Sequence, residues 1–295
     1  MLIKEVCESC KLTKKAIEYY EKQGLVKPKI LPNGYRDYDE RDVAILKEIS
    51  VLRKLDISIH DIQNILNNTD KTAALSKCMY LLDLKIEKEK VQRSYMKHLI
   101  NDYDIEGVFD SLQESTDKFF TIREKLVQAF PGAYGIYLSI HFGQFLNGKI
   151  DDSKKEDAYR KIIDFLDGVN SLNFSSELEE YLESVFTMME KADIEKMNTT
   201  LINAISDVDN YMDNNKEIIE EYLKFRTSTE YKETLAYKIQ KLLLDFQESS
   251  GYYDVFLTNL KIISPSYQEY IKRFEKANQA FIKKYPNSEN LYKHD

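Results

Sequence analysis

The stretch that decides the fold is AIEYYEKQGLVKPKILPNGYRDYDERDVAIL, residues 16–46. The whole chain holds 9 Gly and 5 Pro among 295 residues, so helix breakers are scarce. This stretch nevertheless places Gly24, two prolines and Asn33-Gly34 between two helical patterns. Glycine commonly follows the last turn of a helix, and Asn-Gly favours a hairpin turn. The pattern predicts a helix, then a small β-ribbon or wing, then another helix.

Helical patterns continue on both sides of this wing. The expected helices cover residues 2–9, 12–24, 39–55 and 58–66. We expect the hydroxyls of Thr13 and Ser58 to cap the second and fourth, because each can accept from an unpaired amide of the first turn. The third helix repeats apolar residues at three-residue steps, at Val43, Leu46, Ile49 and Leu52. The first two helices and their short turn outline a helix-turn-helix.

Residues 71–100 form one long helical pattern with a narrow apolar stripe. The stripe consists of Leu75, Met79, Leu82, Ile86, Met96 and Ile100, and Glu89 and Arg93 interrupt it. Such a stripe is typical of a seam between two helices. An ordinary amphipathic helix packed within its own domain explains the pattern equally well.

From residue 105 onward only helices are expected. Residues 153–156, SKKE, match a capping box, and residues 175–189 place four apolar side chains on one face. Ser264-Pro265 predicts the start of a last helix that ends near Tyr285-Pro286, because proline suits the first helical position. The fold class is therefore mainly all-α.

Charge is unevenly distributed along the chain. The net charge is −8, yet residues 1–36 contain seven Lys and one Arg against four Glu, a local charge of +4. A basic end on an acidic body fits one surface that faces phosphate and another that faces something else.

Cysteine use and hydropathy indicate a cytoplasmic protein with no membrane partner. Three cysteines, an odd number, do not form a disulfide framework, and no signal peptide is visible at the N-terminus. Residues 126–148 contain no Asp, Glu, Lys or Arg and are long enough for a membrane span. Because this stretch also holds His141 and several amide side chains, we expect a buried core helix instead.

Residues 2–68 resemble the DNA-binding domain of the MerR-type (mercury-resistance regulator) transcription factors. The matching segments are TKKAIEYYEKQGLV, NGYRDYDERDVAIL and VLRKLDISIHDIQNIL. The resemblance implies a winged helix-turn-helix DNA-binding domain over residues 1–70 and an antiparallel dimerisation helix over 71–104. An all-helical effector-binding domain would then cover 105–295. The resemblance thus favours the seam interpretation of the long helix.

The resemblance also implies a mechanism. A homodimer would bind a pseudo-palindrome in double-stranded promoter DNA and distort it when an effector binds, so that RNA polymerase is affected indirectly. No cofactor, catalytic residue or metal site is expected. The sequence has no phosphate loop, no metal-spaced histidine cluster and no nucleophile motif.

DNA contacts are expected from the second helix, the wing and the end of the third helix. The expected residues are Thr13, Lys14, Lys15, Tyr19, Tyr20, Tyr35, Arg36, Arg53 and Lys54. A recognition helix enters the major groove, and a guanidinium at a wing can reach a phosphate or a narrow groove. One tyrosine of the pair is expected to pack inward.

Glu18 departs from the family pattern, which usually has Arg at this position. A carboxylate beside phosphate is repulsive. Either Glu18 pairs with Lys14, Lys15 or Lys22, or the docking on DNA differs.

Three interpretations compete for the signal that residues 105–295 receive. The first is a small, apolar organic effector bound near Tyr134, Tyr137, His141, Phe142 and Phe145, with Glu179, Glu180 or Glu183 available to a cation. Aromatic residues at this spacing are also typical of an ordinary core. The second is a protein-interaction module. The third is a metal or redox sensor that uses Cys78, although no cysteine follows it.

Overall fold

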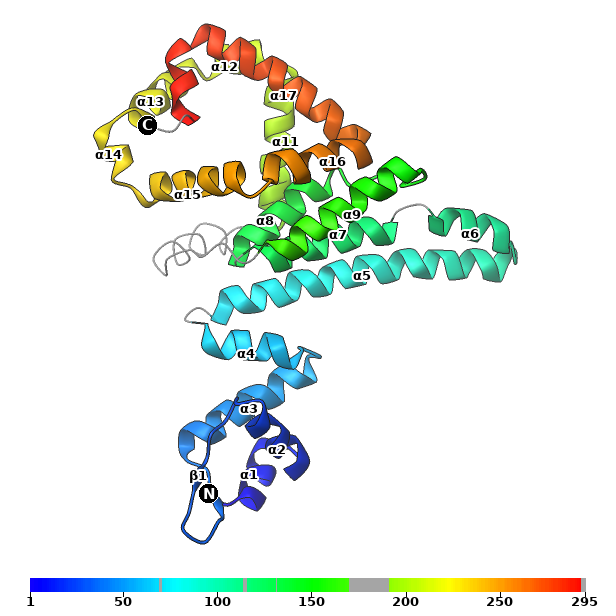
Figure 1. Ribbon diagram of the computed structural model, residues 1–295, viewed down its shortest axis with the longest axis vertical. Helices are drawn as coiled ribbons and strands as arrows, with labels where there is room; N and C mark the ends of the chain where they lie inside the picture. Colours follow the sequence, from blue (N-terminus) through cyan, green and yellow to red (C-terminus); the bar gives the residue numbers. More distant parts are fainter. Residues whose placement is uncertain (69–70, 114–115, 131, 170–190, 293–295) are drawn as a thin grey trace. The chain divides into compact units, whose positions relative to one another are not determined.

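The computed structural model describes residues 1–68, 71–113, 116–130, 132–169 and 191–292 (Figure 1). Within these ranges the chain is helical apart from one two-stranded ribbon, which confirms a mainly all-α fold. It divides into an N-terminal unit, Met1–Cys78, and a C-terminal unit, Met79–Asp295. The helix expected over 175–189, with Glu179, Glu180 and Glu183, lies outside the described residues.

The N-terminal unit is a small helical domain with a wing. Its elements are α1 (Ile3–Cys10), α2 (Lys14–Lys22), β1 (Lys29–Ile30), β2 (Arg36–Asp37), α3 (Glu40–Lys54), α4 (Ile59–Asn67) and the start of α5 (Lys71–Asn101). The strands are antiparallel, with Ile30 opposite Arg36. Gly34 has a φ of 80° in the connecting loop, a conformation that glycine adopts without strain. The predicted wing is therefore confirmed.

Local capping fixes the helix ends that the sequence predicts. The Thr13 hydroxyl accepts from the Ala16 amide at 3.1 Å, and the Ser58 hydroxyl accepts from the Asp61 amide at 3.1 Å. Gly24 follows α2 with a φ of 73°. These contacts set where α2 and α4 begin and where the chain leaves α2 for the wing.

One hydrophobic core joins the elements of the N-terminal unit. Its buried members are Val6, Cys10, Ile17, Tyr20, Val26, Tyr38, Val43, Leu46, Ile49, Leu52, Ile62 and Ile65. The three-residue repeat predicted for α3 faces this core. Because α2 and the wing share the core, the surfaces that they expose are held in a fixed relation.

The C-terminal unit consists of helices throughout the described residues. After the rest of α5 its elements are α6 (Ile105–Gln113), α7 (Thr116–Ala129), α8 (Gly132–Gly143), α9 (Ser153–Gly168), α11 (Lys191–Ser206), α12 (Val208–Asn214), α13 (Lys216–Arg226), α14 (Thr229–Lys232), α15 (Leu235–Ser249), the π-helical η1 (Tyr252–Leu257), α16 (Thr258–Ile263), α17 (Pro265–Lys284) and the 3-10 helix η2 (Pro286–Tyr292). Helix α8 packs against both α7 and α11, and α9 packs against α7 and α16 (Figure 1).

The uncharged stretch 126–148 lies in the core, but it is not one helix. It forms the end of α7, all of α8 and the loop that follows. Leu126, Leu138 and Phe142 are buried, which confirms the core placement. The sequence places Pro131 between the two helices, and proline has no amide to continue a helical ladder. No helix in the described ranges is long and apolar enough to cross a membrane.

The N-cap of helix α9 lies one residue before the position that the capping-box pattern predicts. Asp152 is the N-cap, and its carboxylate accepts from the Lys155 amide at 2.8 Å, so Ser153 is the first helical residue. The prediction of a cap at Ser153 is wrong because Asp caps a helix as well as Ser does. Its negative charge also suits the positive end of the helix.

The start of α17 matches the prediction and adds a tertiary contact. Ser264 is buried, and its hydroxyl accepts from the Tyr267 amide at 3.1 Å. The same hydroxyl donates to the carbonyl of Phe145 at 2.5 Å. The cap therefore also ties α17 to the segment that follows α8.

Removing this cap should destabilise the C-terminal unit. We expect Ser264→Ala to lower the free energy of unfolding by about 1–2 kcal/mol, because both a buried cap and a tertiary hydrogen bond are lost. Urea unfolding followed by far-ultraviolet circular dichroism measures the change. Ser153→Ala is the matched control and should change stability by less than about 0.5 kcal/mol. Equal effects of the two substitutions would contradict this assignment of caps.

Candidate nucleic-acid interface and ligand sites

The first turn of α2 exposes the lysines that were predicted to contact DNA. Thr13, Lys14 and Lys15 are all exposed there, with the Thr13 hydroxyl engaged as the cap. Lys14 lies 3.8 Å from Glu18, one helical turn further along. This is one of the two arrangements expected for Glu18. An exposed pair of this kind contributes only about 0.3–0.5 kcal/mol, so Lys14 can exchange it for a phosphate at little cost.

The tyrosine pair divides between the core and the surface, as expected. Tyr20 is 6% exposed and packs in the N-terminal core, whereas Tyr19 is 45% exposed. The two rings meet edge to face with centroids 5.9 Å apart. The phenol of Tyr19 is therefore the one on the surface that also carries Lys15.

The wing is tied to the end of α2 through Glu21. Arg36 donates its Nε hydrogen to one carboxylate oxygen of Glu21 at 2.6 Å, and the hydroxyl of buried Tyr38 donates to the other. The hydrogen bond with Glu21 raises the pKa of Arg36. Burial is the main cause that raises the pKa of Tyr38, and the hydrogen bond with Glu21 is the next. Glu21 was not among the residues predicted from the sequence to form this surface. Tyr35 is exposed beside this cluster.

Arg53 and Lys54 lie exposed in the last turn of α3. Arg53 donates from Nη1 to the carbonyl of Ile57 at 2.7 Å, across a turn in which Asp56 has a φ of 59°. Arg53 therefore braces the connection between α3 and α4, and Lys54 lies next to it.

The predicted effector residues belong to α8 and the segment after it, but they differ in accessibility. Tyr134, Phe142 and Phe145 are buried in the main core of the C-terminal unit, whereas Tyr137 and His141 are partly exposed. The rings of Tyr137 and His141 stack with centroids 5.8 Å apart. The structure thus brings the five side chains together and leaves two of them within reach of a ligand.

His141 is held as a neutral imidazole. Its Nδ1 lies 3.0 Å from Oδ1 of Asn198 on α11. Burial lowers the pKa of His141, and the hydrogen bond with Asn198 opposes this effect only in part. The neutral imidazole and the ring of Tyr137 together form an aromatic surface without charge.

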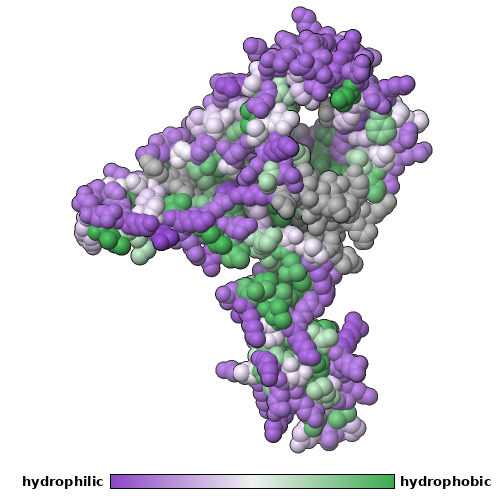
Figure 2. Space-filling view, turned by 180° about the vertical axis from the view of Figure 1, so that it is seen from behind, coloured by the Kyte–Doolittle hydropathy of each residue, from purple (hydrophilic) through white to green (hydrophobic). Residues whose placement is uncertain are grey.

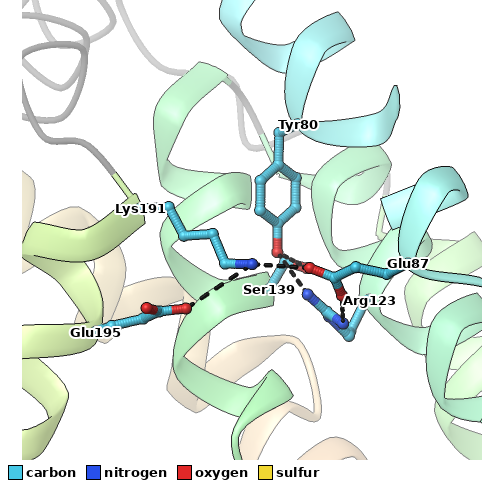
Figure 3. A network of polar contacts seen from close by, with 6 residues as sticks. All are labelled: Tyr80, Glu87, Arg123, Ser139, Lys191 and Glu195. Atoms are coloured by element: carbon cyan, nitrogen blue, oxygen red, sulfur yellow. Dashed lines mark hydrogen bonds and ion pairs between the residues drawn. The ribbon is translucent and has the colours of Figure 1, made fainter. Parts of the chain in front are cut away.

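A polar network on the C-terminal unit was not predicted from the sequence (Figure 3). Glu87 of α5 pairs with Arg123 of α7 and with Lys191 of α11. The sequence offers only a weak signal: Arg123 lies between the apolar pairs Phe119-Phe120 and Leu126-Val127, and its neighbours Glu124 and Lys125 are also charged. Sequence alone does not show that its partners come from segments 36 and 68 residues away.

The cysteines show no sign of a metal or redox centre. Burial raises the pKa of both Cys10 and Cys78, which disfavours the thiolate that metals and oxidants react with. Among the described residues, no three His, Cys, Asp or Glu side chains gather as metal ligands.

Comparisons with known proteins agree on the N-terminal unit. Residues 1–69 match the family described as MerR HTH family regulatory protein. The chain is 33% identical over 93 residues to the mercuric resistance operon regulatory protein of Bacillus cereus, which covers 31% of this chain and 69% of that protein. It is 30% identical over 128 residues to the HTH-type transcriptional regulator YfmP of Bacillus subtilis, covering 43% and 87%. It is 31% identical over 109 residues to HTH-type transcriptional regulator HmrR of Rhizobium leguminosarum, covering 34% and 84%.

These similarities cover between 31% and 43% of this chain. They therefore carry no statement about what the larger, C-terminal part of the chain recognises.

His141 should make stability depend on pH. A histidine whose pKa is lowered by folding stays neutral in the folded state while the unfolded chain takes up a proton. Stability is therefore lost as pH falls below the ordinary value of 6.5, by at most about 1.4 kcal/mol per pH unit. We expect His141→Gln to flatten this loss when urea unfolding is followed between pH 7.5 and 5. The exposed His60 provides the control variant His60→Gln, and parallel curves for all three proteins would contradict the prediction.

Proposed function

This chain belongs to the MerR family of transcription regulators, and we propose that it acts as a cytoplasmic homodimer on promoter DNA. In this proposal the dimer binds a pseudo-palindrome and distorts it when a small molecule binds the C-terminal unit, so that RNA polymerase responds indirectly. The observation that carries the proposal is the shared core that presents the first turn of α2 and the wing.

The DNA-binding proposal rests on the cations of the N-terminal unit. Lys14 and Lys15 open α2, where a recognition helix reaches the edges of the major groove, and the Tyr19 hydroxyl can donate to a phosphate. Arg53 and Lys54 are proposed to contact the backbone further along. Tyr20 acts from within the core, where it positions α2.

Arg36 is proposed as the wing contact beside Tyr35. Glu21 is only 12% exposed and takes the Nε donor of Arg36. A guanidinium has five N–H donors, so Arg36 can keep Glu21 and still offer its Nη groups to a phosphate. The ion pair thus orients the guanidinium before DNA arrives.

The dimer proposal rests on the two faces of α5 within the C-terminal unit. Tyr80 and Leu84 are buried in a small core with α7, α8 and α11. The opposite face carries the predicted stripe, whose members Met79, Leu82, Ile86, Met96 and Ile100 are between 40% and 80% exposed. Hydrophobic side chains also gather over α6 and the adjoining end of α5 (Figure 2). Exposed apolar surface of this extent marks an interface, and a second α5 in antiparallel orientation is the proposed partner.

The effector proposal rests on α8. Tyr137 and His141 offer a stacked, partly exposed aromatic surface, which Tyr134, Phe142 and Phe145 support from the core. A largely apolar small molecule is the proposed ligand of this surface.

A charge in the stripe should break the dimer. We expect Leu82→Glu to yield a single chain in light scattering and to lower DNA affinity at least tenfold, because one protomer then holds only one half-site. Gln92→Glu adds the same charge to an exposed position beside the stripe and should stay dimeric. A dimeric Leu82→Glu, or a wild type that is already monomeric, would sink the dimer scheme.

Arg36 should contribute a phosphate contact. We expect Arg36→Ala to weaken binding to all DNA sequences alike and to reduce the slope of log affinity against log salt by about one unit. Fluorescence anisotropy over a salt series measures the slope. Arg273→Ala removes an equal charge from α17 and should leave the slope unchanged. An unaltered slope in Arg36→Ala would remove this residue from the interface.

A further inference from the structure

The C-terminal unit contains a polar cavity that the proposed function does not use. It has a volume of about 380 Å³ and lies among α5, α7, α8 and α11. The side chains that matter to the argument are Glu87, Arg123, Gln144, Lys191, Glu195 and Asn198. Two cations, two carboxylates and two amides therefore surround one small space, and none of the predicted effector residues lines it.

Two cations share one carboxylate in this cavity. Oε2 of Glu87 accepts from Nη1 of Arg123 at 2.8 Å, and Oε1 accepts from Nζ of Lys191 at 2.8 Å (Figure 3). Lys191 also lies 3.8 Å from Glu195. Burial works against the charge of Glu87, but the hydrogen bonds from Lys191 and Arg123 lower its pKa below the usual value. The structure thus contains an anion site that its own α5 helix fills.

Glu87 fills this site incompletely. The side chain of Arg123 is 16% exposed, and its Nε is buried with no hydrogen-bond partner among the described residues. Its Nη2 lies 3.5 Å from the hydroxyl of Tyr80, at the outer limit for a hydrogen bond. A buried unpaired donor costs about 1–3 kcal/mol, and more when it is charged. Because Glu87 is attached to α5, it reaches only Nη1.

Gly143 leaves the room that the guanidinium occupies. A Cβ atom at this position would lie 3.1 Å from Nε of Arg123, closer than almost any side chain tolerates. Gly143 also lines the cavity. Helix α8 therefore approaches Arg123 with bare backbone, and the guanidinium can turn toward the cavity without meeting a side chain there.

A carboxylate that is not attached to the chain can satisfy Arg123 better than Glu87 does. Arginine binds carboxylates through two parallel N–H groups, and this geometry is both stronger and more selective than a single contact. The amides of Gln144 and Asn198 and the carboxylate of Glu195 offer partners for hydroxyl or ammonium groups elsewhere on the ligand.

We propose that this cavity binds a small carboxylate-bearing molecule, which displaces Glu87 from Arg123 and Lys191 and so removes the ion pairs that tie α5 to α7 and α11. The binding step stands on the cavity alone, whereas its regulatory consequence rests on the proposed function. The helix that loses these ion pairs is the one that carries the exposed stripe. Asn198 lines the cavity and also forms a hydrogen bond with His141. A ligand that moves Asn198 would therefore change the contacts of the aromatic surface of α8.

The test is binding of defined oxyanions to the full chain. Titration calorimetry with L-glutamate, succinate and inorganic phosphate, each at the same ionic strength, should show binding of at least one carboxylate. We expect Glu87→Gln to tighten this binding about tenfold, because the internal competitor loses its charge, and Arg123→Gln to weaken it by at least tenfold. A purely structural role of Glu87 predicts no tightening.

Matched variants separate the site from general effects of charge. Glu269→Gln and Arg273→Gln alter an exposed ion pair of α17 in the same chemical way and should bind the probe as the wild type does. Lys191 is 42% exposed, so Lys191→Met provides a second loss-of-binding variant if Arg123→Gln fails to fold.

Each remaining outcome counts against the inference. It is overturned if no carboxylate binds, if phosphate alone binds, or if Glu87→Gln binds no tighter than the wild type. DNA affinity of the unliganded protein is measured in parallel. Failure of the wild type to bind DNA would refute the proposed function and leave a positive calorimetric result intact.

Discussion

Helix α5 carries apolar side chains on opposite sides, and much of the structure depends on how both are covered. Over the C-terminal unit, one side is buried with α7, α8 and α11, and the other is the exposed stripe. A monomer in water leaves that second side uncovered, which is unfavourable for so much exposed apolar surface. A helix of 31 residues, with Glu87 on its buried side, is thus both the proposed dimer contact and a wall of the polar cavity. Any ligand that changes the Glu87 contacts acts on the same helix that is proposed to hold two chains together.

The N-terminal unit shows how a small core prepares a charged surface. Twelve buried side chains bring α2 and the wing together, and Glu21 adds a polar tie between them. The result is that Lys14, Lys15 and Arg36 are exposed while the backbone beneath them is fixed. Glu18, which differs from the residue that the family resemblance led us to expect, pairs with Lys14 within α2.

Local chemistry made part of this fold predictable. The caps Thr13 and Ser58 were identified because a hydroxyl before a helical repeat acts within three residues, whereas the start of α17 was identified from Pro265. The same reasoning failed at Ser153, because the preceding Asp152 caps the helix by accepting from the Lys155 amide. The uncharged stretch 126–148 was expected to be a single helix, since its composition signals burial but not where a helix is interrupted. The apolar stripe of α5 was visible as a repeat, yet its exposure could be known only once the other side had found its partners.

The candidate sites likewise divide into those that the sequence predicted and those that only the packing of the helices reveals. Surface cations of the N-terminal unit followed from their place in a recognisable pattern. One tyrosine of the pair was expected to pack inward, and only the structure shows that it is Tyr20. The cavity around Arg123 could not be foreseen, because its residues come from four helices and no spacing in the sequence links them. Likewise, the partial burial of His141 and its bond to Asn198 depend on α11 packing against α8.

Two copies of this chain are proposed to read DNA together. The most direct test selects bound sequences from random double-stranded DNA with the purified full chain, and then maps the protected bases and the number of chains on each duplex. The account predicts two half-sites related by two-fold symmetry, with centres about one helical turn (roughly 34–36 Å) apart, and two chains per duplex. Selection of a single unsymmetrical site occupied by one chain, or no enrichment of any sequence, would contradict it.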